Sequence, residues 1–221
     1  MSILPRTVTE ALRLIEKAED AHADLIEVRL DCLKDYSDLA DVAAHGKTLK
    51  IATCKLRSCQ GKSSGTETEQ TQLLLSAAKS GFEYVDVELT QPKLKNAIKE
   101  LKLLSVKSIV SFHDFADTPS PAELNSVLER EIASGADVCK IVTTAKRIED
   151  NLTLLNFTAT AASKAKIVCF AMGERGKVSR LLSPLFGGYF TFASLERGSE
   201  TAAGQMTIQE MRAAYELLGL K

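Results

Sequence analysis

Residues 108–142, SIVSFHDFADTPSPAELNSVLEREIASGADVCKIV, contain one complete strand–helix–strand repeat. Its two ends, Ser108 to Phe112 and Asp137 to Val142, are apolar runs of strand length. Between them, Pro121 to Ser134 has the apolar spacing of a helix, begins at a proline and ends before Gly135. Runs that are continuous in Val, Ile and Leu are typical of strands covered on both faces, so the repeat predicts two strands of a parallel sheet.

The same alternation extends over the whole chain. The other predicted strands are Ile3 to Leu4, Leu25 to Leu30, Thr48 to Cys54, Tyr84 to Leu89, Lys166 to Phe170 and Tyr189 to Ala193. The other predicted helices are Val8 to Ala21, Asp38 to Ala44, Glu69 to Ser80, Pro92 to Leu103, Ile148 to Ser163, Lys177 to Phe186 and Thr207 to Leu218. Because eight such units close a ring, we predict an α/β fold, a compact (β/α)₈ TIM barrel that forms a single domain over residues 1–221. An open doubly wound sheet is disfavoured, since neither G-x-G-x-x-G after the first strand nor a Walker loop is present.

Composition excludes several classes of protein. The chain has 28 Lys+Arg and 29 Asp+Glu, which argues against a nucleic-acid binder. There is no apolar run of the roughly 20 residues that span a membrane, and Met1 to Arg6 do not resemble a signal peptide. We therefore expect a soluble, cytoplasmic protein with no nucleic-acid or membrane partner. The five cysteines lack a second metal-ligand pair, so we predict reduced thiols and no metal site.

Polar residues inside the apolar runs indicate where a site lies, because a barrel holds its active site at the carboxyl ends of its strands. Glu27, Arg29 and Asp31 alternate along one predicted strand and therefore share one side. If that side is the barrel interior, Glu27 and Arg29 can pair and present hydrogen-bonding groups to a polar ligand. The alternative is an ion pair with a structural role only.

Lys140 lies in Val138-Cys139-Lys140-Ile141-Val142, a strand expected to have no face in water. Desolvation lowers the pKa of a buried lysine, and a neutral amine can form a Schiff base with a carbonyl group. A lysine that extends from the strand end, or that pairs with a carboxylate, is the alternative. His113 is the only histidine at the carboxyl end of a predicted strand, where it can move protons near neutral pH; otherwise it is a core residue.

Three further side chains are expected at the same end of the barrel. Arg57 follows the third predicted strand, Arg180 the seventh and Gln205 the eighth. An arginine suits a carboxylate, and an amide suits hydroxyl groups. Together with Lys140, these residues predict a small hydroxylated acid that carries a ketone as the ligand.

These residues resemble the type I 3-dehydroquinate dehydratases, the Schiff-base enzymes of the shikimate pathway, over nearly the whole chain. The matching motifs are Glu27-Val28-Arg29 with Asp31, Ser111 to Phe115, Lys140 in its apolar strand, Met172-Gly173 with Gly176 to Arg180, and Ala203-Gly204-Gln205. The resemblance implies a (β/α)₈ homodimer that removes water from 3-dehydroquinate to give 3-dehydroshikimate, a step of aromatic amino acid biosynthesis, without a metal or organic cofactor.

The resemblance also implies roles for individual residues. Lys140 would attack the ketone, His113 would be the general acid and base, and Arg180 would bind the substrate carboxylate. Met172 and Phe115 would line the site. The full set of implied substrate-binding residues is Ser2, Glu27, Arg29, Arg57, Phe115, Met172, Arg180, Thr201 and Gln205.

The sequence departs from the family pattern after Arg57. The family usually has a glutamate there that partners the histidine, whereas this chain has Ser58-Cys59-Gln60. Gln60 is one replacement, and Glu67 or Glu88 could supply the carboxylate instead. Thr201 stands where a serine is usual. Two other functions stay open from the sequence: a Schiff-base aldolase of the barrel class, and a barrel that only binds ligands.

Overall fold

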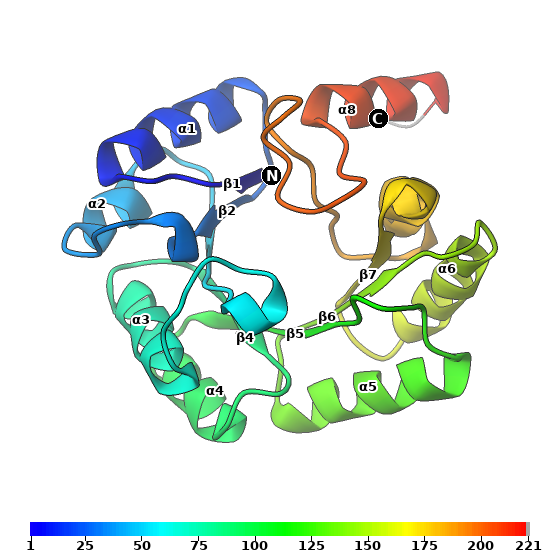
Figure 1. The fold of residues 1–221 in the computed structure, drawn as a ribbon, viewed down its shortest axis with the longest axis horizontal. Coiled ribbons are helices and arrows are strands. Elements are labelled where there is room, and N and C mark those ends of the chain that lie inside the picture. The colour runs from blue at the N-terminus through cyan, green and yellow to red at the C-terminus, as the bar shows by residue number, and fades with distance from the viewer. Residues whose placement is uncertain (220–221) are drawn as a thin grey trace.

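The computed structural model describes residues 1–219 and shows one sheet of seven parallel strands whose order in space is their order in the chain. The strands curve around a centre, and the helices lie outside them (Figure 1). The strands are β1 (Ser2–Ile3), β2 (Ile26–Arg29), β3 (Lys50–Thr53), β4 (Tyr84–Glu88), β5 (Lys107–His113), β6 (Val138–Thr144) and β7 (Ile167–Met172). The predicted α/β class with parallel strands is confirmed.

The helices alternate with the strands, as predicted. They are α1 (Val8–Asp20), α2 (Leu39–Ala44), α3 (Glu67–Lys79), α4 (Leu94–Leu103), α5 (Pro121–Ser134), α6 (Asp150–Ala161), α7 (Lys177–Leu182) and α8 (Ile208–Leu217). Four 3₁₀ turns are added: η1 (Leu30–Cys32), η2 (Arg57–Cys59), η3 (Glu174–Gly176) and η4 (Ser183–Phe186). The turn η2 begins four residues after the end of β3 and η3 begins two residues after the end of β7, so both lie at the carboxyl end of the sheet.

The eighth predicted strand is not formed within residues 1–219, so a full (β/α)₈ barrel is not confirmed. Residues 189–193 run between β7 and β1 but make one backbone hydrogen bond to each. Tyr189 N donates to Ile167 O at 2.7 Å, and Ser2 N donates to Ala193 O at 3.0 Å. Because β1 has only two residues, it offers too short an edge for a regular ladder of hydrogen bonds.

The inner face of the sheet is apolar at one end and charged at the other. Ile51, Tyr84, Ile109, Val138 and Val168 belong to the inner apolar cluster, near the amino ends of their strands. Since side chains alternate along a strand, the residues in phase with them further along point inward too. These are Asp86 and Glu88 on β4, Ser111 and His113 on β5, and Lys140 on β6.

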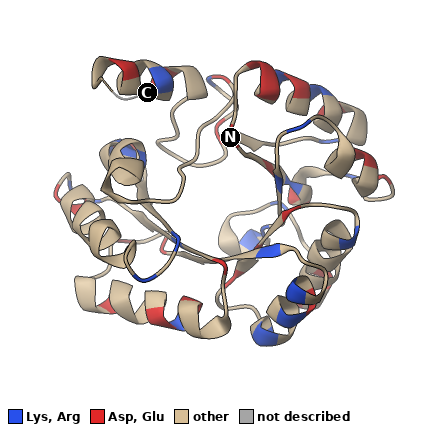
Figure 2. Cartoon of the chain, turned by 180° about the vertical axis from the view of Figure 1, so that it is seen from behind, with Lys and Arg blue, Asp and Glu red and all other residues tan. Residues whose placement is uncertain are grey.

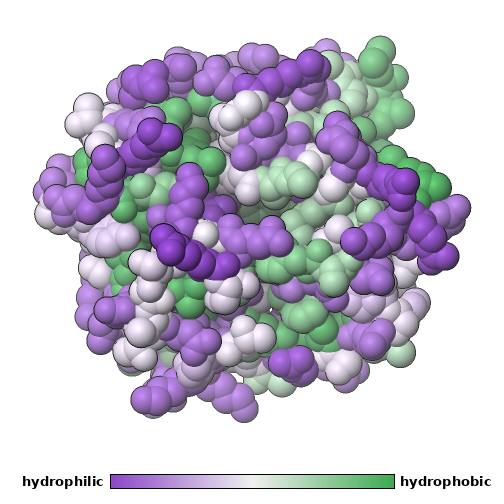
Figure 3. Space-filling view, viewed as in Figure 1, coloured by the Kyte–Doolittle hydropathy of each residue, from purple (hydrophilic) through white to green (hydrophobic). Residues whose placement is uncertain are grey.

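The outer surface is mainly polar. Figure 2 shows most charged residues on the outer helices and loops, with a few on the strands. On the side seen in Figure 1, hydrophilic side chains dominate and hydrophobic ones are visible towards the centre (Figure 3). None of the helices within residues 1–219 has the length and apolar character needed to cross a membrane.

Glu131 is an ionisable residue whose side chain has no access to water. It lies on α5, is fully buried, and neither carboxyl oxygen has a hydrogen-bond partner. Burial raises the pKa of this carboxyl well above its usual value, so the folded protein holds it neutral. An unfolded chain ionises it above its ordinary pKa, near 4.5. The stability that the neutral form contributes is therefore present at acid pH and lost as pH rises towards the folded-state pKa.

We expect Glu131→Gln to remove this pH dependence. Between pH 5 and pH 8 the unfolding free energy of the wild type should fall more than that of the variant, because only the wild type has a carboxyl at this position whose pKa is raised by folding. Urea unfolding at several pH values measures the difference. If the unfolding free energies of the two proteins change with pH in parallel, Glu131 is not the source of the pH dependence.

Candidate active site

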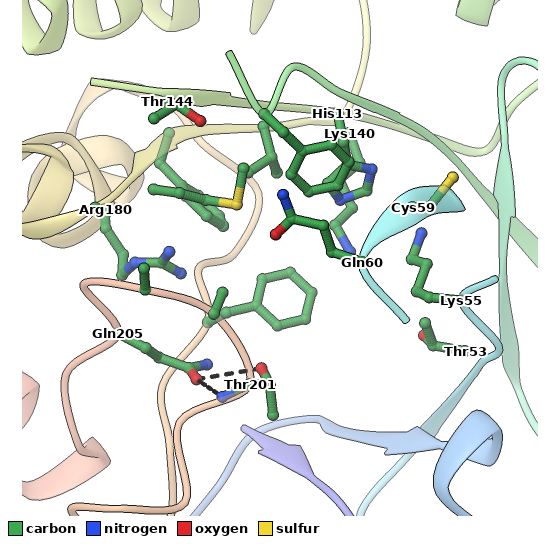
Figure 4. A pocket seen from close by; sticks show the side chains of 18 of the residues that line it. Thr53, Lys55, Cys59, Gln60, His113, Lys140, Thr144, Arg180, Thr201 and Gln205 are labelled. Carbon is green, nitrogen blue, oxygen red and sulfur yellow. Dashed lines mark hydrogen bonds between the residues drawn. The ribbon is translucent and has the colours of Figure 1, made fainter. Parts of the chain in front are cut away.

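A cavity of about 270 Å³ opens at the carboxyl ends of the strands (Figure 4). It is lined by most of the residues that the sequence singled out. These are Glu27, Arg29, His113, Phe115, Lys140, Met172, Arg180, Thr201 and Gln205. Arg180 and Gln205 lie on one side of the cavity, and His113 and Lys140 lie on the other (Figure 4).

Lys140 reaches the cavity from the middle of β6 and is 4% exposed. Its Nζ donates to Asp86 Oδ2 at 2.8 Å and lies 3.7 Å from Glu27 Oε1. The ring centroid of Phe192 is 4.4 Å from the same nitrogen. Burial and pairing with a carboxylate, which the sequence left as alternatives, thus occur together.

His113 ends β5 and is held by a carboxylate and an aromatic ring. Its Nδ1 lies 3.2 Å from Glu88 Oε1, and its ring stacks on Phe115 with centroids 5.7 Å apart. Burial lowers the pKa of His113, and the ammonium group of Lys55 lowers it further, so the imidazole is neutral at neutral pH. Of the two candidate partners, Glu88 makes the contact, whereas Glu67 is exposed at the start of α3.

Lys55 is a second buried amine in the cavity, and the sequence analysis missed it. Its Nζ donates to Asp86 Oδ1 at 2.8 Å, to Glu88 Oε1 at 2.5 Å and to Ser111 Oγ at 3.0 Å. Burial alone would lower the pKa of Lys55, but Asp86 and Glu88 outweigh burial and raise it above its usual value. Lys55 is therefore a fixed cation.

Asp86 and Glu88 remain ionised despite their burial. Burial raises the pKa of each carboxyl, but nearby cations have the larger combined effect. The ammonium groups of Lys140 and Lys55 hold the pKa of Asp86 well below its usual range. Lys55 and His113 lower that of Glu88 to about 2. The alternation of Tyr84, Asp86 and Glu88 in an apolar run was the sequence signal for both carboxylates.

The charges on β2 pair differently from the prediction. Arg29 does not pair with Glu27 but forms a two-point ion pair with Asp31, with both N–O distances 2.8 Å. Glu27 instead accepts hydrogen bonds from Ser2 Oγ and from Thr53 Oγ1, the latter at 2.9 Å. Ser2 is buried behind Glu27 and does not line the cavity.

Arg57 also lies outside the cavity, because its side chain is exposed on η2. β3 ends at Thr53, and the 3₁₀ turn that follows breaks the alternation that would carry residue 57 inward. Lys55 takes the inward position instead. Cys59 and Gln60, from the end of the same turn, line the cavity.

Arg180 and Gln205 present polar groups without partners. Arg180 is 1% exposed, and its Nε and Nη2 have no hydrogen-bond partner; its guanidinium lies 4.2 Å from the ring centroid of Phe170. Burial lowers its pKa to about 10, so it is still a cation at neutral pH. Gln205 Oε1 accepts from Thr201 N at 2.7 Å, but its buried Nε2 is unpaired. Such donors are suited to an anionic, hydroxylated ligand.

The segment that carries Thr201 and Gln205 is anchored to the loop after β7. Gly173 N donates to Ala203 O at 2.9 Å. Gly204 has a φ of +74°, and a Cβ at this position would overlap the carbonyl group of Gly173. Close approach of two glycines thus places Gln205 over the cavity.

Comparison with known proteins identifies the family. The model of the type I 3-dehydroquinase family matches residues 1–221. The chain belongs to this family. A 3-dehydroquinate dehydratase of Dehalococcoides mccartyi is 39% identical over 201 residues, which cover 91% of this chain and 88% of the relative. One from Coxiella burnetii is 34% identical over 216 residues, which cover 97% and 90%.

Solved structures agree with this assignment. The 3-dehydroquinate dehydratase of Geobacillus kaustophilus superposes with a TM-score of 0.90 at 27% identity, covering 99% of this chain and 89% of that one. The Enterococcus faecalis enzyme gives a TM-score of 0.85 at 27% identity, covering 98% and 92%. The predicted family and its enzyme class, a carbon–oxygen lyase, are thereby confirmed.

The unpaired guanidinium of Arg180 should reduce stability in the absence of ligand. We expect Arg180→Met to be more stable than the wild type by about 1 kcal/mol, because it replaces a desolvated cation with an apolar side chain. Denaturant unfolding of the ligand-free proteins measures this. The matched control is Arg197→Met, which removes an exposed partner of Glu210 and should change stability by no more than about 0.5 kcal/mol. A marked loss of stability in Arg180→Met alone would contradict the interpretation.

Proposed function

We propose that the chain removes water from 3-dehydroquinate to give 3-dehydroshikimate, through a Schiff base on Lys140 with His113 as general acid and base. The reaction belongs to the shikimate pathway of aromatic amino acid biosynthesis. The observation that carries the proposal is that groups able to react and a group able to bind a carboxylate lie on opposite sides of one cavity. An amine and a neutral imidazole face it on one side, and an unpaired buried guanidinium faces it on the other.

Lys140 is a better nucleophile than Lys55, the other amine in the cavity. Lys55 donates to three oxygens, which engage all three of its N–H bonds, and two of its partners are carboxylates. Lys140 donates to one oxygen, and the ring of Phe192 lies close to the same nitrogen. Because only a free amine attacks a carbonyl carbon, the less restrained lysine forms the imine.

The reaction balances with these two side chains. Lys140 gives one proton of its ammonium group to His113 and adds to the ketone, and the carbinolamine takes that proton back as it loses water to give a protonated imine. His113 takes a proton from the adjacent carbon, forming an enamine, whose electron pair expels the hydroxyl group one carbon further on. That hydroxyl leaves as water with a proton from His113. Water then hydrolyses the imine and restores the amine, so the net change is the loss of one water molecule.

Asp86 stabilises the cationic intermediate. The protonated imine carries the same charge as the lysine from which it forms, at the position that Asp86 already neutralises. Because the pKa of Asp86 is held well below its usual range, the carboxylate stays ionised at neutral pH and does not compete with His113 for protons.

The remaining cavity residues bind the substrate. Arg180 takes the carboxylate, and Gln205 Nε2 donates to a hydroxyl group, which satisfies the donors that have no partner in the protein. Glu27, Arg29 and Thr201 offer polar groups to the other hydroxyls, and Met172 and Phe115 supply apolar walls.

We also propose a domain architecture and an assembly for the enzyme that its seven strands do not by themselves establish. Residues 189–193 occupy the place of an eighth strand, bonded once to β7 and once to β1, so that one (β/α)₈-type domain surrounds the site. A cytoplasmic homodimer stays a prediction from the family resemblance.

Trapping with borohydride tests the covalent step. We expect 3-dehydroquinate and sodium borohydride to add one substrate-derived mass to the intact protein, and peptide mapping to place it on Lys140 and not on Lys55. Lys140→Ala should show no adduct. Absence of an adduct on the wild type would exclude the Schiff base and leave the barrel as a binding module. Trapping of a smaller or phosphorylated carbonyl compound in place of 3-dehydroquinate would indicate an aldolase.

His113→Ala tests the proton transfer. We expect kcat to fall by at least about 10²-fold, because general acid–base catalysis is lost, while KM changes little. Borohydride should still trap an adduct on Lys140 in this variant, which confirms that the cavity is intact. Unchanged kcat would exclude His113 as the proton carrier.

A further inference from the structure

Lys55 takes no part in the covalent chemistry, yet it contacts the partners of both reacting side chains. Asp86 binds Lys55 through Oδ1 and Lys140 through Oδ2, each at 2.8 Å. Glu88 binds Lys55 at 2.5 Å through Oε1, the oxygen that lies 3.2 Å from His113 Nδ1. A continuous chain of contacts therefore runs from Lys140 through Asp86, Lys55 and Glu88 to His113.

We propose that Lys55 is a positioning residue for the dehydration, whose ammonium group holds Asp86 and Glu88 in place and so sets Lys140 and His113 on the same substrate. The proposal rests on the function proposed above. Asp86 and Glu88 are two residues apart on β4 and point to the same side, and both are buried. Without a cation between them, two such carboxylates repel each other and turn apart.

The geometry makes Lys55 suited to this role. It is anchored at three points, with the hydroxyl of Ser111 as the third acceptor at 3.0 Å. Ser111 Oγ itself donates to Asp86 Oδ1 at 2.7 Å. The backbone beside Lys55 is fixed as well, because Lys55 N donates to Asp31 Oδ1 at 3.3 Å and Lys55 O accepts from Ser63 N at 3.3 Å. The ammonium group is thus held in place from both ends of its side chain.

Lys55 also acts on His113 through its charge. The charged groups that face the imidazole are Lys55 from the loop after β3, Asp86 and Glu88 from β4, and Lys140 from β6. Burial is the largest cause of the lowered pKa of His113; Lys55 is the next, and Lys140 adds to it, whereas Glu88 opposes them. Removal of Lys55 should therefore raise the pKa of His113, and removal of the Glu88 charge should lower it.

Lys55→Met separates this role from a purely structural one. We expect kcat to fall by about 10²-fold, the cost of misplaced catalytic groups, while borohydride still traps substrate on Lys140. The ring protons of His113, followed by NMR in the substrate-free protein and assigned with His113→Gln, should titrate about one pH unit higher. The acidic limb of the kcat/KM profile should move in the same direction. Lys55→Arg, which keeps the charge, should restore kcat to within about tenfold of the wild type.

Glu88→Gln provides a second variant that keeps the size of the side chain. It should move the His113 titration to lower pH, opposite to Lys55→Met, whereas general damage to the cavity would not give opposite signs. Lys50→Met is the matched control. Lys50 is also buried on β3, but it lies at the amino end, where its Nζ donates to Thr48 O at 2.9 Å. We expect this variant to leave the His113 titration and kcat unchanged.

The outcomes distinguish this proposal from the function on which it rests. A wild type that forms no adduct with 3-dehydroquinate overturns the proposed function. A wild type that forms the adduct and turns over, together with a folded Lys55→Met variant of unchanged kcat and unchanged His113 titration, overturns the role of Lys55 alone. If Lys55→Met does not fold, the Lys55→Arg and Glu88→Gln variants test the proposal instead. It is refuted if the titration of His113 in Glu88→Gln does not move to lower pH.

Discussion

Mutual neutralisation of charges on the inner side of the curved sheet is the constraint on which the rest of this structure depends. A buried charge is costly unless an opposite charge and hydrogen bonds compensate it. Asp86 meets this condition by lying between two ammonium groups, and Lys55 meets it by lying between two carboxylates. Each group is therefore ionised because its neighbours are. The arrangement is cooperative, so the lysine and histidine that we propose to react are held in fixed positions by residues that have no covalent role in the proposed reaction.

On the other side of the cavity no such neutralisation occurs, because Arg180 is a cation without an anion beside it. A protein selected only for stability would pair this guanidinium or replace it. Its retention next to an unpaired amide is understandable if a ligand supplies the missing charge during each turnover. The cavity thus combines one side whose charges neutralise each other, where we propose that the chemistry takes place, with a second side whose donors lack partners and would bind an acid.

The sequence was sufficient to single out the two residues that we propose to react, because each broke a local rule. A lysine in the middle of an apolar strand and a histidine at the end of another were visible without any structure, and both line the cavity. The network that supports them was harder to find. Asp86 and Glu88 alternate along their strand as Glu27 and Arg29 do, so the sequence indicated that they share one side. It did not indicate which residues they pair with, because the partner of a buried charge depends on which strands are neighbours. Arg57 does not line the cavity, because periodicity holds only as far as the strand does and β3 ends four residues earlier. The missing eighth strand has a similar origin on one of its sides: β7 offers an edge of six residues, but β1, the neighbour on the other side, has only two.

The contact between Gly204 and Gly173 has a consequence for how the protein can change over time. Gly204 has no side chain and does not line the cavity, yet the overlap expected of even a methyl group at residue 204 would lift Gln205 away from its place. Whether a position near the cavity tolerates substitution should therefore depend on the space around its backbone as well as on the chemical role of its side chain. In a library of random variants, position 204 would therefore be depleted of every residue that carries a Cβ atom.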